Sequence, residues 1–130
     1  MPAKLNLYLN PVPAGFPSPA EDVIDRSLDL QELLVKHPAA TFFVRVRGES
    51  MLGAGIHHDD ILVVDRSREP QGDQIVVAAL DGEFTVKHLH RKGKKVFLVP
   101  DNVKYQSIEI KDEMDFSIWG VVTSVIRILE

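Results

Sequence analysis

Residues 74–89, QIVVAALDGEFTVKHL, hold the clearest secondary-structure signal in this chain. Two runs rich in apolar and β-branched residues, 74–80 and 83–89, flank the pair Asp81-Gly82. Both central residues of the tightest hairpin turn need positive φ, which glycine and aspartate tolerate. An Asp-Gly pair between two such runs therefore favours a two-residue hairpin. The stretch predicts two neighbouring antiparallel strands.

Further strand signals lie on both sides of this hairpin. Upstream, residues 41–47 alternate after an initial aromatic pair, and residues 61–64 form a short apolar run. The run follows the acidic turn Asp59-Asp60, which we expect to be solvated. Downstream, residues 95–99 and 116–128 are rich in apolar and β-branched side chains. Together these runs predict a mainly β core of about 100 residues.

One short helix is expected ahead of the β core, over residues 30–37. Asp29 is a good N-cap for it, and Glu32 lies at the capping-box position. Pro38 ends it, because proline cannot continue a helix. The leucines at positions 30, 33 and 34 predict one buried stripe.

The N-terminal stretch differs in composition from the rest of the chain. Five of the eight prolines lie within its first 20 residues. Each proline fixes φ and pushes the preceding residue toward extended geometry. We therefore expect an extended Pro-rich arm over residues 1–26 and a β-rich core over residues 27–130. Such an arm can lie along a groove as an irregular strand.

Composition argues against several classes of function. The net charge of the 130 residues is −4, so direct binding of nucleic-acid phosphates is not expected. Without cysteine, the chain has no disulfides, thiolate nucleophiles or cysteine metal ligands. No apolar run approaches the roughly 18 residues of a membrane span, and we expect a cytoplasmic protein. No phosphate-binding or dinucleotide motif is found, and no cofactor is expected.

Two residues have the chemistry of a catalytic pair. Ser50 follows a predicted strand in a Gly-Glu-Ser-Met turn, where a hydroxyl can face a cleft beside backbone N–H groups. Lys87 lies on the second strand of the hairpin. A buried lysine can lose its charge and take a proton from a hydroxyl, because burial shifts lysine pKa values by about 3–5 units. Taken singly, Ser50 is typical of a turn and Lys87 of a solvated strand face.

Other candidate sites carry weaker signals. Ala14-Gly15, in the arm, is a bond between small residues that a nucleophile could approach closely. The five histidines form no metal-ligand pattern, although His57-His58 beside Asp59-Asp60 could hold a cation. A Ser–His–Asp triad built on Ser50 also stays open, since triads are set by space and not by chain order.

In combination these residues resemble the LexA/UmuD family of self-cleaving serine proteases. The shared features are an Ala-Gly bond in a Pro-rich arm, the turn at residues 48–51 and the strand at residues 83–87. The spacings, 36 residues from Ala14 to Ser50 and 37 from Ser50 to Lys87, are similar to the family's. Residues 15–20 look specifically like UmuD-like members, and the likeness extends from Gly15 to the C-terminus.

The resemblance implies a LexA C-terminal-domain-like β fold and a catalytic dyad. Ser50 would be the nucleophile, Lys87 the general base, and the cut would fall between Ala14 and Gly15. Two features depart from the family pattern. Residues 57–60, His-His-Asp-Asp, stand where relatives tend to have a glycine before the final aspartate. Only 14 residues precede the expected cut and leave no room for a helix-turn-helix, so we do not expect a LexA-type repressor unless the chain is a fragment of one.

The resemblance further implies a function in the SOS response to DNA damage. RecA filaments on single-stranded DNA would promote the cut. The shortened form would act as a homodimer with an error-prone translesion polymerase of the UmuC or DNA polymerase V type. A second interpretation is a LexA-like, phage or plasmid regulator, such as an antirepressor, that uses the fold mainly as a protein-binding module. Signal peptidase shares Ser–Lys chemistry but would need a membrane anchor, which we do not find.

Overall fold

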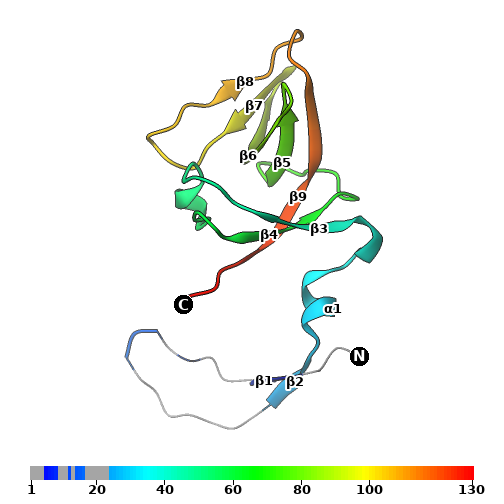
Figure 1. The fold of residues 1–130 in the computed structure, drawn as a ribbon, viewed down its shortest axis with the longest axis vertical. Helices are drawn as coiled ribbons and strands as arrows, with labels where there is room; N and C mark the ends of the chain where they lie inside the picture. The colour runs from blue at the N-terminus through cyan, green and yellow to red at the C-terminus, as the bar shows by residue number, and fades with distance from the viewer. Residues whose placement is uncertain (1–4, 9–11, 13, 17–23) are drawn as a thin grey trace. The chain divides into compact units, whose positions relative to one another are not determined.

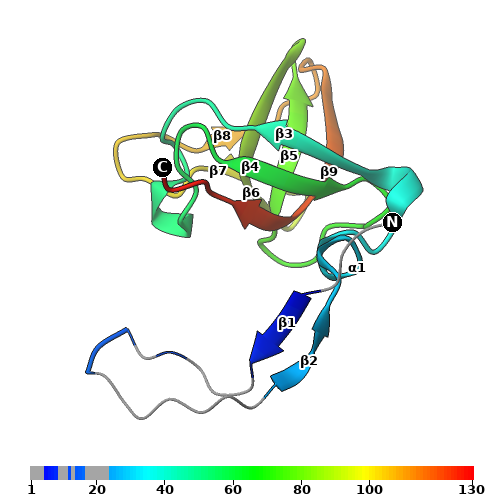
Figure 2. The same ribbon diagram turned by 60° about the horizontal axis from the view of Figure 1, so that its bottom comes forward.

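The computed structural model describes residues 5–8, 12, 14–16 and 24–130. The chain divides into two compact units, residues 1–36 and residues 37–130, and each is described by itself (Figures 1 and 2). The described residues form nine strands and one short α-helix, which confirms the predicted mainly β class. None of the helices in these ranges is long and apolar enough to cross a membrane.

The first unit contains a strand pair and the helix. β1 (Leu5–Tyr8) pairs antiparallel with β2 (Ile24–Leu28), a pairing that the proline-rich composition did not indicate. The helix α1 (Leu30–Leu34) follows directly. Asp29 caps it as predicted, because its carboxylate accepts the backbone N–H of Gln31 at 3.0 Å and of Glu32 at 3.3 Å.

The predicted length of the helix and its buried stripe are wrong. α1 ends at Leu34 and not at His37, because the next residue, Val35, is already extended. Leu30 is 51% exposed and Leu33 is 41% exposed. A helix of five residues makes little more than one turn, so it is too short to build a continuous apolar face.

The second unit is a seven-stranded antiparallel sheet with the strand order β3-β4-β9-β5-β6-β7-β8. Two 3₁₀ turns, η1 (Pro38–Ala40) and η2 (Leu52–Ala54), lie on either side of β3. The strands are β3 (Thr41–Arg45), β4 (Ile61–Asp65), β5 (Ile75–Leu80), β6 (Glu83–Lys92), β7 (Lys95–Val99), β8 (Ile108–Glu109) and β9 (Phe116–Ile126).

The predicted hairpin is confirmed as β5 and β6. Leu80 pairs with Glu83, and the two turn residues have φ values of +49° at Asp81 and +87° at Gly82, as this turn requires. β6 continues to Lys92, beyond the predicted end of the strand, because β7 pairs with its last five residues. β6 is thus a long interior strand, paired with β5 on one side and with β7 on the other.

β9 joins the two halves of the sheet. Its first half pairs with β5 and its second half with β4, and the register shifts once in each pairing. Such bulges bend a strand, and Figures 1 and 2 show β3 and β4 crossing the direction of β5 and β6 steeply. Gly120 lies in the bend, where an added Cβ would stand 2.6 Å from Val64 Cγ1.

The bend gives the sheet two apolar clusters, one on each face. One contains Leu89 and Leu98 with buried residues of β5 and β9. The other packs residues of the β3–η2 connection against β4 and β5, and its buried members are Val46, Met51, Ile56, Leu62, Val64 and Val77. This second cluster supports the candidate site, because it buries Met51, the residue after Ser50.

The acidic turn before β4 is solvated at Asp59, as predicted, but not at Asp60. Asp60 is 2% exposed, and its carboxylate accepts two N–H bonds from Arg127, at 2.7 and 2.8 Å. Burial of an aspartate costs hydration, and this cost is offset when an arginine fork satisfies both of its oxygens. Asp59 has φ +73°, a left-handed conformation that glycine adopts more easily than other residues.

Candidate active site

Ser50 lies on the turn that follows β3. Gly48 begins the turn at φ +90°, which a residue with a side chain rarely adopts, and its N–H donates to His58 Nδ1 at 3.0 Å. Met51 is 2% exposed and packs in the core cluster that contains Val46. The turn is therefore anchored by a buried side chain directly beside the serine, while Ser50 itself keeps partial exposure.

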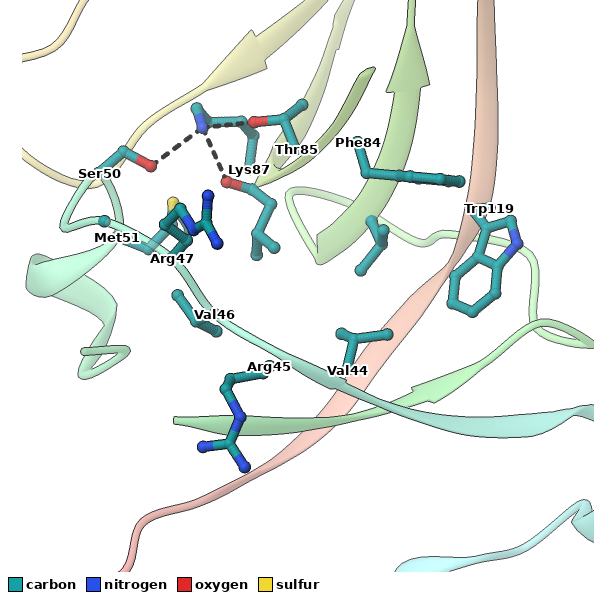
Figure 3. Close-up of a pocket in the computed structure, with 13 residues that line it drawn as sticks. Val44, Arg45, Val46, Arg47, Ser50, Met51, Phe84, Thr85, Lys87 and Trp119 are labelled. Carbon is teal, nitrogen blue, oxygen red and sulfur yellow. Dashed lines mark hydrogen bonds between the residues drawn. The ribbon is translucent and has the colours of Figure 1, made fainter. Parts of the chain in front are cut away.

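Lys87 reaches Ser50 from the middle of β6. Its Nζ lies 2.9 Å from Ser50 Oγ, 2.7 Å from Thr85 Oγ1 and 3.0 Å from the carbonyl oxygen of Val86 (Figure 3). Lys87 is half-buried, and not on a solvated strand face. The fold thus brings together the two residues, 37 positions apart, that the sequence suggested as a catalytic pair.

Burial makes the charged form of Lys87 less favourable than it is in water. Desolvation lowers the pKa of Lys87 below its ordinary value. A neutral amine has two N–H donors and one lone pair, whereas an ammonium has three donors and no lone pair. The three neighbouring oxygens can accept all three N–H groups of an ammonium. When the amine is neutral, Thr85 and Val86 can accept its two N–H groups, and its lone pair can take the proton of the Ser50 hydroxyl.

Thr85 is a site residue that the sequence prediction did not single out. It lies two residues before Lys87 on the same strand, and residues two apart share a face of a sheet. The threonine hydroxyl therefore stands beside the lysine side chain, within hydrogen-bond distance of its Nζ. That spacing was the signal that could have identified Thr85.

An apolar cavity of about 370 Å³ opens beside Ser50 and Lys87. In Figure 3 the pair lies at one end of the lining, while Phe84 and Trp119 lie at the other. The cavity can therefore receive apolar side chains of a substrate whose reacting bond lies at the serine. Its apolar walls come from four strands and the residue after β3: Val44, Val46, Val77, Phe84, Val86 and Trp119.

The expected cleavage bond belongs to the first unit. Ala14 and Gly15 are exposed and lie outside the strands. A Cβ built on Gly15 would meet no atom within 4 Å, and the next residue, Phe16, is 93% exposed. The flanking prolines, Pro13 and Pro17, lie outside the described residues. The bond between Ala14 and Gly15 is thus sterically open to a nucleophile.

The other sites considered from the sequence are not assembled. In the described ranges, no group of three or more histidine or acidic residues could hold a metal ion. The Asp60 carboxylate binds Arg127 and the backbone N–H of His57 instead of forming a cation site. The hydroxyl of Ser50 contacts a lysine, so the Ser–His–Asp alternative has no support in the geometry.

A serine hydroxyl bonded to a desolvated lysine at the end of an apolar cavity is an arrangement suited to serine hydrolase chemistry, because the amine can activate the hydroxyl. Comparison with known proteins agrees with this class. The chain belongs to the Peptidase S24-like family, whose match covers residues 6–123. The resemblance to the LexA/UmuD family that the motifs indicated is thereby confirmed.

Similar proteins cover most of the chain. The chain is 44% identical to Protein SamA of Salmonella typhimurium over 121 residues, which are 93% of this chain and 84% of that protein. It is 45% identical to Protein MucA of Escherichia coli over 117 residues, 89% of this chain and 80% of that protein. The LexA repressor of Ectopseudomonas mendocina is 40% identical over 117 residues, 89% of this chain and 57% of that protein.

Proposed function

We propose that this chain cleaves its own backbone between Ala14 and Gly15, with Ser50 as nucleophile and Lys87 as general base. The observation that carries the proposal is the 2.9 Å hydrogen bond between Lys87 Nζ and Ser50 Oγ. It is supported by the desolvation that lowers the pKa of Lys87 and by membership of a peptidase family.

The first half of the reaction forms an acyl-enzyme. Neutral Lys87 takes the proton of the Ser50 hydroxyl as Oγ bonds to the carbonyl carbon of Ala14. The backbone N–H of Ser50 and a neighbouring amide stabilise the negative oxygen of the intermediate. The bond to the Gly15 nitrogen then breaks, and Lys87 gives its proton to that nitrogen, so the new N-terminus leaves as an amine.

The second half restores the enzyme. A water molecule attacks the ester between Ser50 and Ala14 while Lys87 accepts one of its protons. The ester bond breaks, the proton returns to Ser50 Oγ, and Ala14 is released as the carboxyl end of a short peptide. The net reaction consumes one water and one peptide bond and needs no cofactor.

In this proposal residues 1–26 are the substrate arm and residues 27–130 the catalytic and dimerisation core. Val12 and Phe16, on either side of the cleavage bond, are apolar and exposed, which matches the apolar lining of the cavity. The rate of cleavage then scales with the fraction of time that the arm occupies the cavity. An activator that raises this fraction accelerates the reaction without supplying any chemistry.

The test is the pH dependence of self-cleavage in purified protein. Because the reactive form of Lys87 is neutral, the rate should rise as pH is raised from about 7 toward the ordinary lysine pKa of about 10.4. Intact-protein mass spectrometry should show two products that meet at Ala14 and Gly15. Ser50→Ala and Lys87→Ala should abolish them.

Matched controls separate the site from general effects on folding. Ser117 on β9 and Lys95 on β7 are exposed residues outside the cavity lining. Ser117→Ala and Lys95→Ala should therefore cleave at the rate of the unchanged protein. Cleavage that persists in folded Lys87→Ala, or a cut at another bond, would refute the assignment.

From the similarity to this family we further propose that the reaction belongs to the SOS response. The product spanning residues 15–130 acts as a homodimeric subunit of an error-prone, UmuC-type translesion polymerase in the cytoplasm, and a RecA filament on single-stranded DNA promotes the cut. The similarity to SamA and MucA supports this group of functions. If it is correct, RecA filaments accelerate cleavage, while the net charge of −4 leaves the protein itself without affinity for DNA.

A second candidate follows from the similarity to a LexA repressor. In it the chain is a LexA-like, phage or plasmid regulator, such as an antirepressor, that works mainly through protein binding. The two candidates differ in their dependence on cleavage. A damage-induced mutagenesis assay with Ser50→Ala distinguishes them, because the polymerase function requires the cut and a binding module does not.

A further inference from the structure

His88 follows Lys87 on β6 and binds a different partner. Successive residues of a strand project to opposite faces, so Lys87 and His88 diverge from neighbouring backbone positions. The imidazole Nε2 lies 2.9 Å from Asp101 Oδ2, and Nδ1 lies 2.7 Å from the carbonyl oxygen of Asp73. The His88 side chain is 24% exposed and that of Asp101 is 40% exposed.

Asp101 in turn holds the turn that carries Ser50. Its backbone N–H donates to the Ser50 carbonyl oxygen at 2.8 Å, and its own carbonyl accepts the Gly53 N–H at 2.7 Å. The next residue, Asn102, donates from Nδ2 to the Glu49 carbonyl oxygen at 2.8 Å. Three hydrogen bonds therefore tie residues 101–102 to the nucleophile turn.

Gly53 is what allows this close approach. A Cβ at position 53 would stand 2.2 Å from Asp101 Oδ1 and 2.7 Å from the Asp101 carbonyl oxygen. These contacts close a ring through the backbone and side chains. It runs from Lys87 to His88 along β6, across to Asp101, and through the Asp101 backbone to Ser50, whose hydroxyl returns to Lys87 Nζ.

We propose that His88 and Asp101 are positioning residues, which hold the Ser50 turn against β6 and do so most tightly when His88 is protonated. The carbonyl of Asp73 can only accept, so Nδ1 must carry a hydrogen. Neutral His88 then presents a lone pair at Nε2 to the Asp101 carboxylate, whereas imidazolium donates to both partners. Loss of the proton breaks one bond of the ring and loosens Ser50 relative to Lys87.

The charges around His88 agree with this dependence. Burial alone lowers the pKa of His88, but hydrogen bonds and charges of Asp101 and Asp73 outweigh burial and raise it. Asp101, after β7, and Asp73, before β5, are the acidic groups that face it. The Asp73 carboxylate also accepts from His90, and the Lys87 ammonium, when present, lies on the opposite face of β6.

The site therefore requires opposite protonation states of two neighbouring residues. The dyad needs Lys87 without its proton, and the ring needs His88 with its proton. The consequence for cleavage rests on the proposed self-cleavage. Deprotonation of Lys87 raises the rate with pH, while deprotonation of His88 keeps the rate at high pH below the value that Lys87 alone would give. The linkage between His88 and the Ser50 turn is a property of the fold and exists without cleavage.

The linkage is tested first in Ser50→Ala protein, which stays intact. Nuclear magnetic resonance follows the His88 ring and the backbone amides at positions 50 and 53 between about pH 5 and pH 9. The amides should titrate with the midpoint of the His88 ring. In a His88→Gln protein they should lose this titration, whereas His90→Gln, the matched control on the same strand, should keep it. If the amide signals of residues 50 and 53 do not titrate with the midpoint of the His88 ring, the proposal is overturned. This comparison of midpoints needs no variant of His88.

The catalytic consequence is tested by cleavage rates in a protein with Ser50 restored. His88→Gln should slow cleavage about tenfold, as expected for one lost hydrogen bond to a charged group. His88→Arg, which keeps a permanent positive charge opposite Asp101, should recover most of the rate and remove the limit at high pH. If the unchanged protein, His88→Gln and His88→Arg show the same cleavage rates at every pH, the positioning role of His88 is refuted. If the unchanged protein does not cleave at all, self-cleavage is refuted, and the resonance experiment still decides the linkage.

Discussion

Arg127 and Asp60 form a two-pronged ion pair that joins the end of β9 to the turn before β4. Arg127 Nη2 lies 2.7 Å from Asp60 Oδ2, and Arg127 Nε lies 2.8 Å from Asp60 Oδ1, across 67 positions of sequence. Arg127 Nη2 also donates to the Gly55 carbonyl oxygen at 2.6 Å. The pair therefore fixes the connection between the Ser50 turn and β4.

Removal of Arg127 should destabilise the fold. Arg127→Met leaves the Asp60 carboxylate, which is 2% exposed, without its cation, and an uncompensated buried charge is costly. We expect the Tm to fall by about 5 °C or more. Arg91 on β6 is exposed and serves as the control, so Arg91→Met should leave the Tm nearly unchanged. Equal Tm values for the two variants in a thermal melt would contradict this prediction.

The same pair predicts how stability depends on acid. The Arg127 hydrogen bond lowers the pKa of Asp60 from 3.8 to about 2. Because the folded pKa is below the unfolded one, this contribution is complete above about pH 4 and is lost as pH falls toward 2. Urea unfolding at several pH values should show that loss. In Asp60→Asn this loss of unfolding free energy between about pH 4 and pH 2 should be absent. If the free energy of unfolding of Asp60→Asn falls with acid as steeply as that of the unchanged protein, the ion pair is not its cause.

Thr85 should tune the lysine of the dyad. Thr85→Val keeps the shape but removes the acceptor 2.7 Å from Lys87 Nζ. An acceptor stabilises an ammonium more than an amine, so its loss lowers the Lys87 pKa further, and the rising limb of cleavage against pH should move to lower pH. The maximal rate should fall by about 3- to 10-fold, because the lone pair is no longer aimed at Ser50.

A threonine outside the site provides the control for this experiment. Thr123 on β9 donates from Oγ1 to the Val63 carbonyl oxygen at 3.3 Å and does not line the cavity. Thr123→Val should change neither the pH at which the cleavage rate rises nor the maximal rate of cleavage. If Thr85→Val behaves in the same way, the threonine has no part in preparing Lys87.

Gly120 should be intolerant of a side chain. An alanine Cβ there would stand 2.6 Å from Val64 Cγ1 and 3.2 Å from the Asp65 carbonyl oxygen, in a fully buried region. Overpacking of this kind costs about 1–3 kcal/mol. The free energy of unfolding in urea measures it. Val64→Ala removes the obstructing methyl groups, so the double variant should cost less than the sum of the two single variants. Strict additivity would show that the contact is not the cause.

Local signals were sufficient for every strand of the core except β8 (Ile108–Glu109), which no run in the sequence indicated. The Asp81-Gly82 turn, the alternation from Thr41 and the apolar run at residues 61–64 each depend on neighbours in sequence, and each forms the predicted element. The prediction of the helix was wrong in its length and its burial. A single capped turn makes too few packing contacts to extend the helix further. The β1–β2 pairing was missed, since its partners are separated by a stretch whose composition indicates only an arm.

The sequence by itself determined which residues are chemically able to act. A Gly-Glu-Ser-Met turn, a lysine inside a strand and their spacing were enough to select Ser50, Lys87 and the Ala14-Gly15 bond, because these signals are local or shared with a family. Only the tertiary structure decided that Lys87 is half-buried and 2.9 Å from Ser50. Burial and proximity arise when β6 packs beside the Ser50 turn, a contact between segments 37 residues apart that no local pattern encodes. The same holds for Asp60, which the sequence made a solvated turn residue and the fold buried under Arg127.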